Sequence, residues 1–200
     1  MKTSPIQNLI QQFQKMPTIG AKTAERLAYY IINSQKNEVD KLIQSITQVK
    51  EIIKYCEICF NVSESAVCSI CNNKARNNKS ICIVEHPQDI VSIEKTNCYT
   101  GLYHVLHGVL SPMDGIGPKD IKIGELIHRI KNNENTIQEV IIATNPTANG
   151  EATAVYIKKT LQNQTNVKIT RIGFGLAIGS DISYSDKSTL LKSFLTRTEL

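Results

Sequence analysis

The feature that most constrains this chain is a pair of Cys-x-x-Cys knuckles, Cys56 with Cys59 and, eight residues later, Cys68 with Cys71. Two knuckles can supply four thiolates to one tetrahedral ion, and zinc suits such a ligand set. Two disulfides in a secreted protein are the alternative. The first five residues lead into a polar-faced helix rather than an apolar signal core, so a reducing compartment and a metal are favoured. With four protein ligands, one Zn²⁺ per chain would be structural, not catalytic.

Charge is unevenly distributed along the 200 residues. Residues 1–80 carry 11 Lys and Arg against 6 Asp and Glu, a net charge of +5, whereas residues 81–200 carry 12 of each kind. Such an asymmetry is typical of a protein with one half that faces nucleic acid, although ordinary solubility charge is an alternative. No apolar run approaches the roughly 18 residues needed to span a bilayer, so we expect no membrane partner and a soluble, cytoplasmic protein.

The N-terminal residues predict a helix-hairpin-helix. Ser4 and Pro5 open a helix with one apolar face that ends near Met16, and a second helix carries Ala24, Leu27, Ala28 and Ile31 after the glycine-containing segment 17–23. The hairpin and the start of the second helix could present backbone N–H groups to a DNA phosphate. Lys22 and Arg26 share one face of that helix, so they are the candidate DNA contacts. An ordinary αα-hairpin is the alternative.

A third helix has apolar residues spaced by three and four, at Val39, Leu42, Ile46, Val49 and Ile53, and is expected to end at Tyr55. The simplest interpretation is that this seam covers the first two helices, and a contact between subunits is the alternative. A second hairpin-like stretch, residues 115–119, follows a loop rather than a helix, and we interpret it as a loop.

The C-terminal half alternates short apolar strands with helices. Strands are expected at 80–84, 102–106, 140–143 and 167–172, with helices opening near His86 and spanning 119–130 and 151–161. This alternation predicts a parallel sheet covered on both faces. A last helix is expected after a cap at Ser185 or Asp186. Cys82 is interpreted as a small core residue.

Polar residues gather where the predicted strands end: Glu85 and Asp89 after one strand, and Asn145, Thr147 and Glu151 after another. One alternative is a Mg²⁺-dependent nuclease or nucleotidyl transferase using Glu85, Asp89 and Glu151. However, Asn145 and Thr147 stand where further carboxylates would be needed. Loop caps and a protein-docking surface are therefore favoured, with no catalytic residue. No phosphate-binding Gly-x-x-x-x-Gly-Lys-Ser/Thr loop is present.

Taken in order, these motifs resemble the RecR family of bacterial recombination mediators over essentially the whole chain. The most specific stretches are Ile83-Val84-Glu85-His86-Pro87-Gln88-Asp89, Ser111-Pro112-Met113-Asp114-Gly115-Ile116-Gly117-Pro118, and Ala143-Thr144-Asn145-Pro146-Thr147 with Gly150-Glu151-Ala152-Thr153. The resemblance implies an α+β chain of several domains: a helix-hairpin-helix region (1–55), a four-cysteine zinc finger (56–71), a Toprim domain without catalytic activity and with a mostly parallel sheet (79–175), and a C-terminal oligomer-contact segment (176–200).

The resemblance also implies a function in DNA repair and homologous recombination. Members bind single- and double-stranded DNA without sequence preference, form ring-like tetramers, and act with RecO, and with RecF where it is present, to help load RecA at single-stranded gaps, independently of RecBC. Lys22 and Arg26 would contact DNA, and Glu85 and Asp89 would lie on the face that engages RecO.

The sequence departs from the family pattern at several positions. Thr18 replaces the first glycine of the hairpin, and Asn149 stands where an acidic residue is common. The Walker-B-like stretch of the family is interrupted by serines at 181–186, so no nucleotide binding is carried over.

Overall fold

The computed structural model describes residues 4–133, 136–163, 165–197 and 199. The chain forms two compact units, Met1–Ile53 and Lys54–Leu200.

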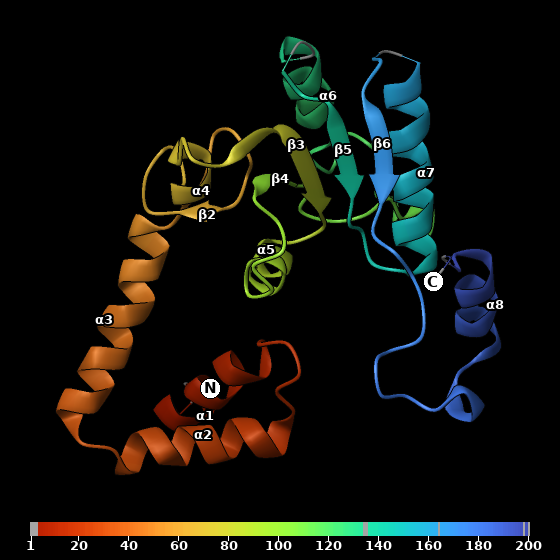
Figure 1. Cartoon of the computed structure of the whole chain (residues 1–200). Helices are drawn as coiled ribbons and strands as arrows, with labels where there is room; N and C mark the ends of the chain where they lie inside the picture. Colours follow the sequence, from red (N-terminus) through yellow and green to blue (C-terminus); the bar gives the residue numbers. More distant parts are fainter. Residues whose placement is uncertain (1–3, 134–135, 164, 198, 200) are drawn as a thin grey trace. The chain divides into compact units, whose positions relative to one another are not determined.

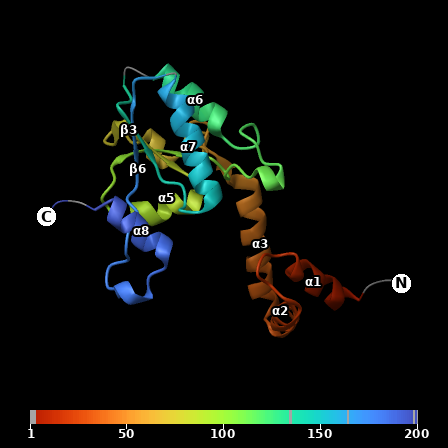
Figure 2. The same ribbon diagram turned by 90° about the vertical axis from the view of Figure 1, so that its right-hand side faces the viewer.

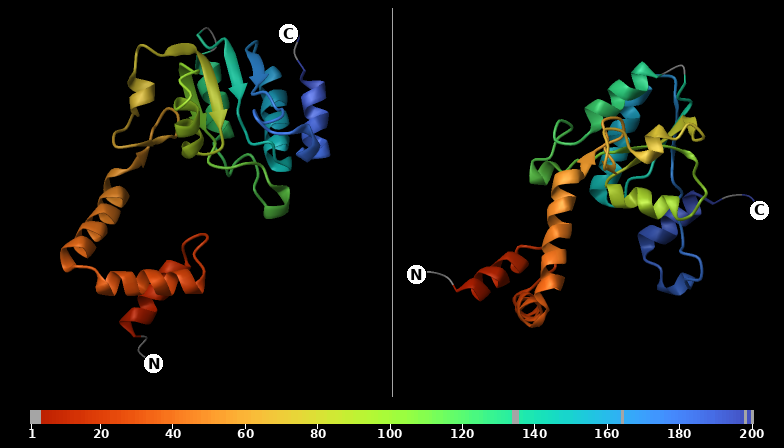
Figure 3. Two further views of the ribbon diagram at one scale, coloured as in Figure 1. Left: turned by 60° about the horizontal axis from the view of Figure 1, so that its bottom comes forward. Right: turned by 90° about the vertical axis from the view of Figure 1, so that its left-hand side faces the viewer.

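The first unit is helical (Figure 3). Helix α1 (Pro5–Gln14) begins at a proline, as expected, although the side chain of Ser4 makes no capping hydrogen bond. Helix α2 (Ala21–Asn33) packs on α1 and buries Ala24 and Ala28. The two small side chains allow close approach of the helices. The helix-hairpin-helix expected from the sequence is therefore present.

Helix α3 (Lys36–Ile52) departs from the expectation that its apolar seam covers α1 and α2. None of its residues is buried, and Leu42, Ile46 and Val49 are 45%, 55% and 58% exposed. That interpretation is wrong, because heptad spacing predicts an apolar side without specifying what covers it. The helix also ends before Tyr55, which lies in a strand.

The second unit begins with a small two-stranded sheet. Strand β1 (Lys54–Tyr55) pairs antiparallel with β2 (Val62–Ser63), and the short helix α4 (Ser69–Asn72) follows. The first knuckle lies in the turn between the two strands, and the second lies at the start of α4. This is the module that carries the four cysteines.

The main sheet is fully parallel and has the strand order β4-β3-β5-β6 (Figure 1). The strands are β3 (Asn77–Val84), β4 (Gly101–Val105), β5 (Glu139–Ile142) and β6 (Lys168–Arg171). Ile81 of β3 pairs with Leu102 on one side and with Val140 on the other. The four predicted strands are present, with small shifts at their ends.

Helices connect the strands. They are α5 (Pro87–Glu94), α6 (Ile123–Asn132) and α7 (Ala148–Gln162). Helix α6 begins four residues later than expected because Lys119–Lys122 form a turn, and α7 begins three residues earlier because Thr147 caps it by accepting from the Gly150 N–H. The segment 115–119 is not helical, as expected, and follows the short 3₁₀ helix η1 (Pro112–Asp114).

Both faces of the sheet are covered. One face packs on α6 and α7 through a core that includes Ile81, Ile83, Leu126, Ile130 and Leu161 (Figure 2). The other face buries Cys82, as expected, with Val84 and Ile90 of α5, and receives Phe60 and Ile70 from the cysteine module. The module is thus part of the cover of the sheet.

The chain then continues through the 3₁₀ helix η2 (Ile182–Tyr184) to helix α8 (Lys187–Leu195). Of the two candidate caps, Asp186 is the N-cap, and it accepts from the backbone N–H groups of Ser188 and Thr189.

Candidate functional sites: a four-cysteine metal centre, a basic hairpin and a closed sheet edge

The four knuckle cysteines come together as the sequence predicts. Their sulfur atoms all lie within 4.8 Å of one another, and Cys56, Cys59 and Cys68 are buried. None of the four forms a disulfide. A tetrahedral zinc with bonds of about 2.3 Å requires sulfur–sulfur separations of about 3.8 Å, and the Cys59 and Cys68 sulfurs are 3.5 Å apart. The cluster therefore has the size and the ligands of a structural zinc site.

Backbone groups support this ligand set. The Cys68 N–H donates to the Cys56 sulfur at 3.3 Å, and the Cys71 N–H donates to the Cys68 sulfur at 3.5 Å. Hydrogen bonds from Cys59 and then Cys71 lower the pKa of the Cys68 thiol, and the same hydrogen bond with Cys68 raises the pKa of the Cys59 thiol. Amide donors to the ligand sulfurs stabilise the thiolate form that binds zinc.

The metal module is attached to the parallel sheet by hydrogen bonds from β4 and the residues after it. The Val105 N–H donates to the Cys59 carbonyl at 2.8 Å, and His107 Nε2 donates to the Phe60 carbonyl at 2.7 Å. The Phe60 ring also lies edge-on to His104, with 5.4 Å between ring centroids. Sequence reasoning missed this attachment, because partners so distant along the chain leave no local pattern.

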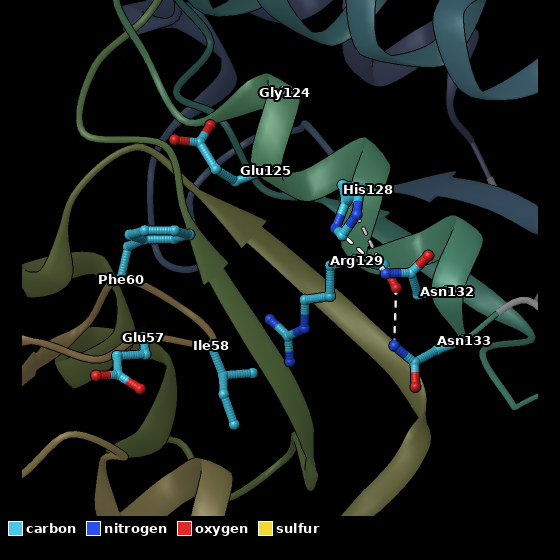
Figure 4. Close-up of a pocket in the computed structure, with 9 residues that line it drawn as sticks. All are labelled: Glu57, Ile58, Phe60, Gly124, Glu125, His128, Arg129, Asn132 and Asn133. Carbon is cyan, nitrogen blue, oxygen red and sulfur yellow. Dashed lines mark hydrogen bonds between the residues drawn. The ribbon is translucent and has the colours of Figure 1, made fainter.

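A cavity of about 580 Å³ lies between this module and α6 (Figure 4). Arg129 reaches from α6 toward Ile58 in this cavity, and its guanidinium donates to the Tyr103 carbonyl at 2.6 Å. Glu57, Glu125 and His128 also line it. Charges of both signs in one cavity do not select a class of ligand, so we assign it no function.

The candidate DNA contacts lie on the exposed side of α2. Lys22 and Arg26 are exposed, one turn apart, in the helix that follows the hairpin. The N-cap position is Gly20, so no side chain caps the first N–H groups of this helix. A Cβ atom on Gly20 would meet nothing within 4 Å, and its φ of −80° is ordinary, so the fold itself does not require a glycine here. An uncapped helix start with two cations is a suitable anion site.

Thr18 takes over the conformation that a glycine would adopt. Its φ is 66°, in the left-handed region that β-branched residues avoid. The departure from the family pattern therefore leaves the hairpin turn in place, with the strain carried by a threonine.

The carboxylates at the sheet edge are engaged by other groups. Glu85 is 5% exposed, and its two carboxylate oxygens accept from the Asn145 backbone N–H and side-chain amide, each at 2.7 Å. Glu85 follows β3 and Asn145 follows β5, at the point where the strand order reverses and doubly wound sheets bind ligands. This hydrogen-bonded pair bridges that crevice.

Glycine at position 150 permits this arrangement. A Cβ on Gly150 would lie 2.1 Å from the Asn145 carbonyl oxygen and 3.0 Å from Glu85 Oε1. The loop after β5 can therefore close on Glu85 only if residue 150 has no side chain. Asn149, at the other departure from the family pattern, donates to the Ser111 hydroxyl at 3.2 Å.

Glu151 and Asp89 are engaged elsewhere. Glu151 accepts from Lys192 of α8 at 2.6 Å and from Arg171 at 2.5 Å, and these cations lower the pKa of its carboxyl. Asp89 accepts from the His86 N–H at 2.8 Å in a capping box that opens α5. Within the described ranges, the cysteines are the one group of three or more His, Cys, Asp or Glu side chains close enough to share a metal ion, so Glu85, Asp89 and Glu151 do not come together as such a group.

Three modules define the class of this protein: a helix-hairpin-helix, a four-cysteine zinc site and a Toprim-type parallel sheet. Comparison with known families assigns the same modules. Residues 6–50 match the helix-hairpin-helix of RecR, residues 53–73 match the four-cysteine zinc finger domain of RecR, and residues 79–173 match the Toprim domain.

Whole-chain comparison agrees with these matches. The chain is 50% identical over 196 residues to "Recombination protein RecR" of Ligilactobacillus salivarius, with 98% of each chain covered. It is 47% identical over 196 residues to the protein of that name from Lacticaseibacillus casei (98% of each chain), and 45% identical over 199 residues to that of Chloroherpeton thalassium (98% of this chain and 97% of the other). The chain belongs to the RecR family of recombination proteins.

This membership confirms the family resemblance, the fold class and the zinc site expected from the sequence. Among the residues that the structure describes, no helix is both long and apolar enough to cross a membrane.

Proposed function

We propose that this chain is a non-enzymatic mediator of recombinational DNA repair. It binds single- and double-stranded DNA through α2 without sequence preference, and it engages RecO on its Toprim domain. Together with RecO, and with RecF where that protein is present, it helps to load RecA on single-stranded gaps. It acts in the cytoplasm and independently of RecBC. The observation that carries the DNA-binding part is the pair of exposed cations, Lys22 and Arg26, beside the uncapped start of α2. Such groups contact phosphates, which carry no sequence information.

One hairpin offers few phosphate contacts, so we propose that the chain acts as a ring-like homo-oligomer, expected to be a tetramer. Two surfaces support subunit contacts: the exposed apolar side of α3, and the C-terminal segment 176–200, in which Tyr184, Phe194 and Leu195 are 90%, 68% and 72% exposed. Exposed apolar patches of this kind are typical of protein interfaces. Repetition of a weak DNA contact in an oligomer raises the overall affinity by avidity.

We propose that the face around Glu85 and Asp89 docks RecO. Glu85 is buried, so its part in docking is to hold the Asn145 loop in shape, whereas Asp89 is only half-buried. Asp89→Asn keeps an acceptor for the His86 N–H but removes the charge. We expect it to weaken RecO binding, measured by calorimetry, and Glu64→Gln, an exposed carboxylate of the zinc module, is the matched control. Equal affinity of both variants for RecO would remove Asp89 from the docking face.

The hydrogen bonds on Glu85 and Glu151 argue against Mg²⁺-dependent turnover. The test is incubation of the purified chain with Mg²⁺ and nicked, gapped or primed DNA. Turnover that disappears in Glu85→Gln would establish the nuclease or transferase alternative and overturn the non-enzymatic part of the proposal.

The DNA-binding part is tested with Lys22→Ala/Arg26→Ala. Its control is Lys36→Ala/Lys41→Ala, which removes the same charge from two exposed positions of α3 in the same unit. The first variant should bind DNA more weakly at every salt concentration. Its plot of log affinity against log salt should flatten by about 0.7 to 0.9 for each phosphate that a chain no longer binds. If the control variant is weakened as much, the binding depends on net charge and not on the hairpin.

A further inference from the structure

The side of α2 that faces away from α1 carries two tyrosines as well as two cations. Successive residues of an α-helix are rotated by about 100°, so Lys22, Arg26, Tyr29 and Tyr30 share about 100° of the helix surface. Ala24 and Ala28, which are 0% exposed, lie on the opposite side. Tyr29 and Tyr30 are 51% and 66% exposed. The four side chains therefore form one surface, which we call the tyrosine–cation face.

Neither tyrosine side chain is buried in the hairpin. Among the described residues, neither ring packs against another aromatic ring, and neither hydroxyl makes a hydrogen bond. The core of the hairpin is completed by the two alanines, with Leu27 and Ile31 half-buried beside them. Two large aromatic rings in solvent are thus available to a ligand.

The combination of groups indicates the chemistry of that ligand. Arg26 lies three and four residues before the tyrosines, so a cation and two rings are neighbours along the helix. Proteins that bind single strands combine cations that follow the phosphates with aromatic rings on which bases stack. In a duplex the base faces are already stacked on one another and only base edges are offered.

We propose that Tyr29 and Tyr30 form a stacking platform for unpaired bases, placed beside the phosphates that Lys22 and Arg26 contact, and that this platform gives the hairpin a preference for single-stranded over duplex DNA. This proposal rests on the DNA-binding function proposed above for α2. Every base has an aromatic face, so the preference is for strand state and not for sequence.

A second copy of the chain is a less suitable occupant of this face. A two-fold contact through this face would bring the Lys22 and Arg26 side chains of one copy close to those of the other. Like charges brought together in this way oppose association. Phosphate groups, in contrast, complement both cations.

The experiment uses the full zinc-loaded chain and compares Tyr29→Ala/Tyr30→Ala with Tyr29→Phe/Tyr30→Phe, which keeps both rings. Binding is measured by fluorescence anisotropy on an oligo-dT strand and on a duplex of equal length, and the mass in solution is measured by light scattering. The alanine variant should bind the single strand at least about fivefold more weakly, the lower limit for the loss of one stacked base. Its duplex affinity and mass should be unchanged, and the phenylalanine variant should bind like the original chain.

Other outcomes overturn the proposal. An equal loss on single strand and duplex, or no loss on either, would exclude a stacking platform. A lower mass of the alanine variant would show that the tyrosines form a subunit contact. Lys22→Ala/Arg26→Ala is measured in parallel and should weaken both substrates, so an unchanged cation variant would refute the DNA-binding function separately from the tyrosine platform.

Discussion

Replacement of Thr18 by glycine should stabilise the helical unit. A left-handed backbone costs an L-residue about 1–2 kcal/mol, and Thr18 has φ of 66°. Glycine removes that cost but loses about 0.5–1 kcal/mol through the greater freedom of the unfolded chain. The net gain therefore lies between about 0 and 1.5 kcal/mol, with a central value of about 0.75 kcal/mol.

Native-state hydrogen exchange of the full chain measures this gain in the unit concerned. Where exchange requires opening of the unit, the amides of α2 should exchange about 3- to 4-fold more slowly in Thr18→Gly, because the opening equilibrium falls by the Boltzmann factor of the central gain. Exchange in the second unit, Lys54–Leu200, should not change.

Gly20→Ala is the matched control for the hairpin. Gly20 has a negative φ and free space around its missing Cβ, but alanine is a poorer N-cap than glycine, so Gly20→Ala should not slow exchange in α2. Faster exchange in Thr18→Gly than in the original chain would refute the reasoning, because it would mean that the threonine side chain contributes more than its backbone strain costs.

Three further predictions concern the second unit. Chelation of zinc should speed hydrogen exchange of the Val105 amide, because this amide donates to the Cys59 carbonyl of the metal module. Unchanged exchange of the Val105 amide in a protein from which zinc has been removed would contradict a structural zinc site. Gly150→Ala should lower the free energy of unfolding in urea by about 2–3 kcal/mol, because its Cβ would overlap the Asn145 carbonyl. The control is Gly124→Ala, whose Cβ would meet nothing within 4 Å, and it should raise the free energy of unfolding by about 0.5–1 kcal/mol. Equal effects of the two substitutions would refute the overlap at Gly150. Burial lowers the pKa of His104 to about 4, so between about pH 6.5 and 4 the unfolded chain binds a proton that the folded chain does not. The free energy of unfolding in urea should therefore fall by about 3 kcal/mol as the pH is lowered across that window. His104→Gln should show a smaller fall, and a pH profile identical to that of the original chain would exclude His104 as the cause.

The features that could be predicted from the sequence are those formed by residues close together along the chain. The spacing of the four cysteines predicts their cluster because each knuckle is a local turn, and the apolar runs predict β3 and β5 because buried parallel strands need them. The exposed seam of α3 shows the limit of this reasoning, since spacing reports an apolar side and not its partner. The partners of Glu85 and Glu151 were missed for the same reason: Asn145 is 60 residues from Glu85, and Lys192 is 41 residues from Glu151.

Those partners make the edge of the sheet a poor site for Mg²⁺. A hydrogen bond to a charged group is worth about 1.5–3 kcal/mol, so a Mg²⁺ ion that displaced both Asn145 donors from Glu85 would have to offset about 3–6 kcal/mol. A cation near Glu151 would in addition face Arg171 and Lys192, which already neutralise that carboxylate. The same bonds fix the loops after β3 and β5 in one arrangement, and a fixed polar surface is what a protein partner needs, because little conformational entropy is then lost on docking.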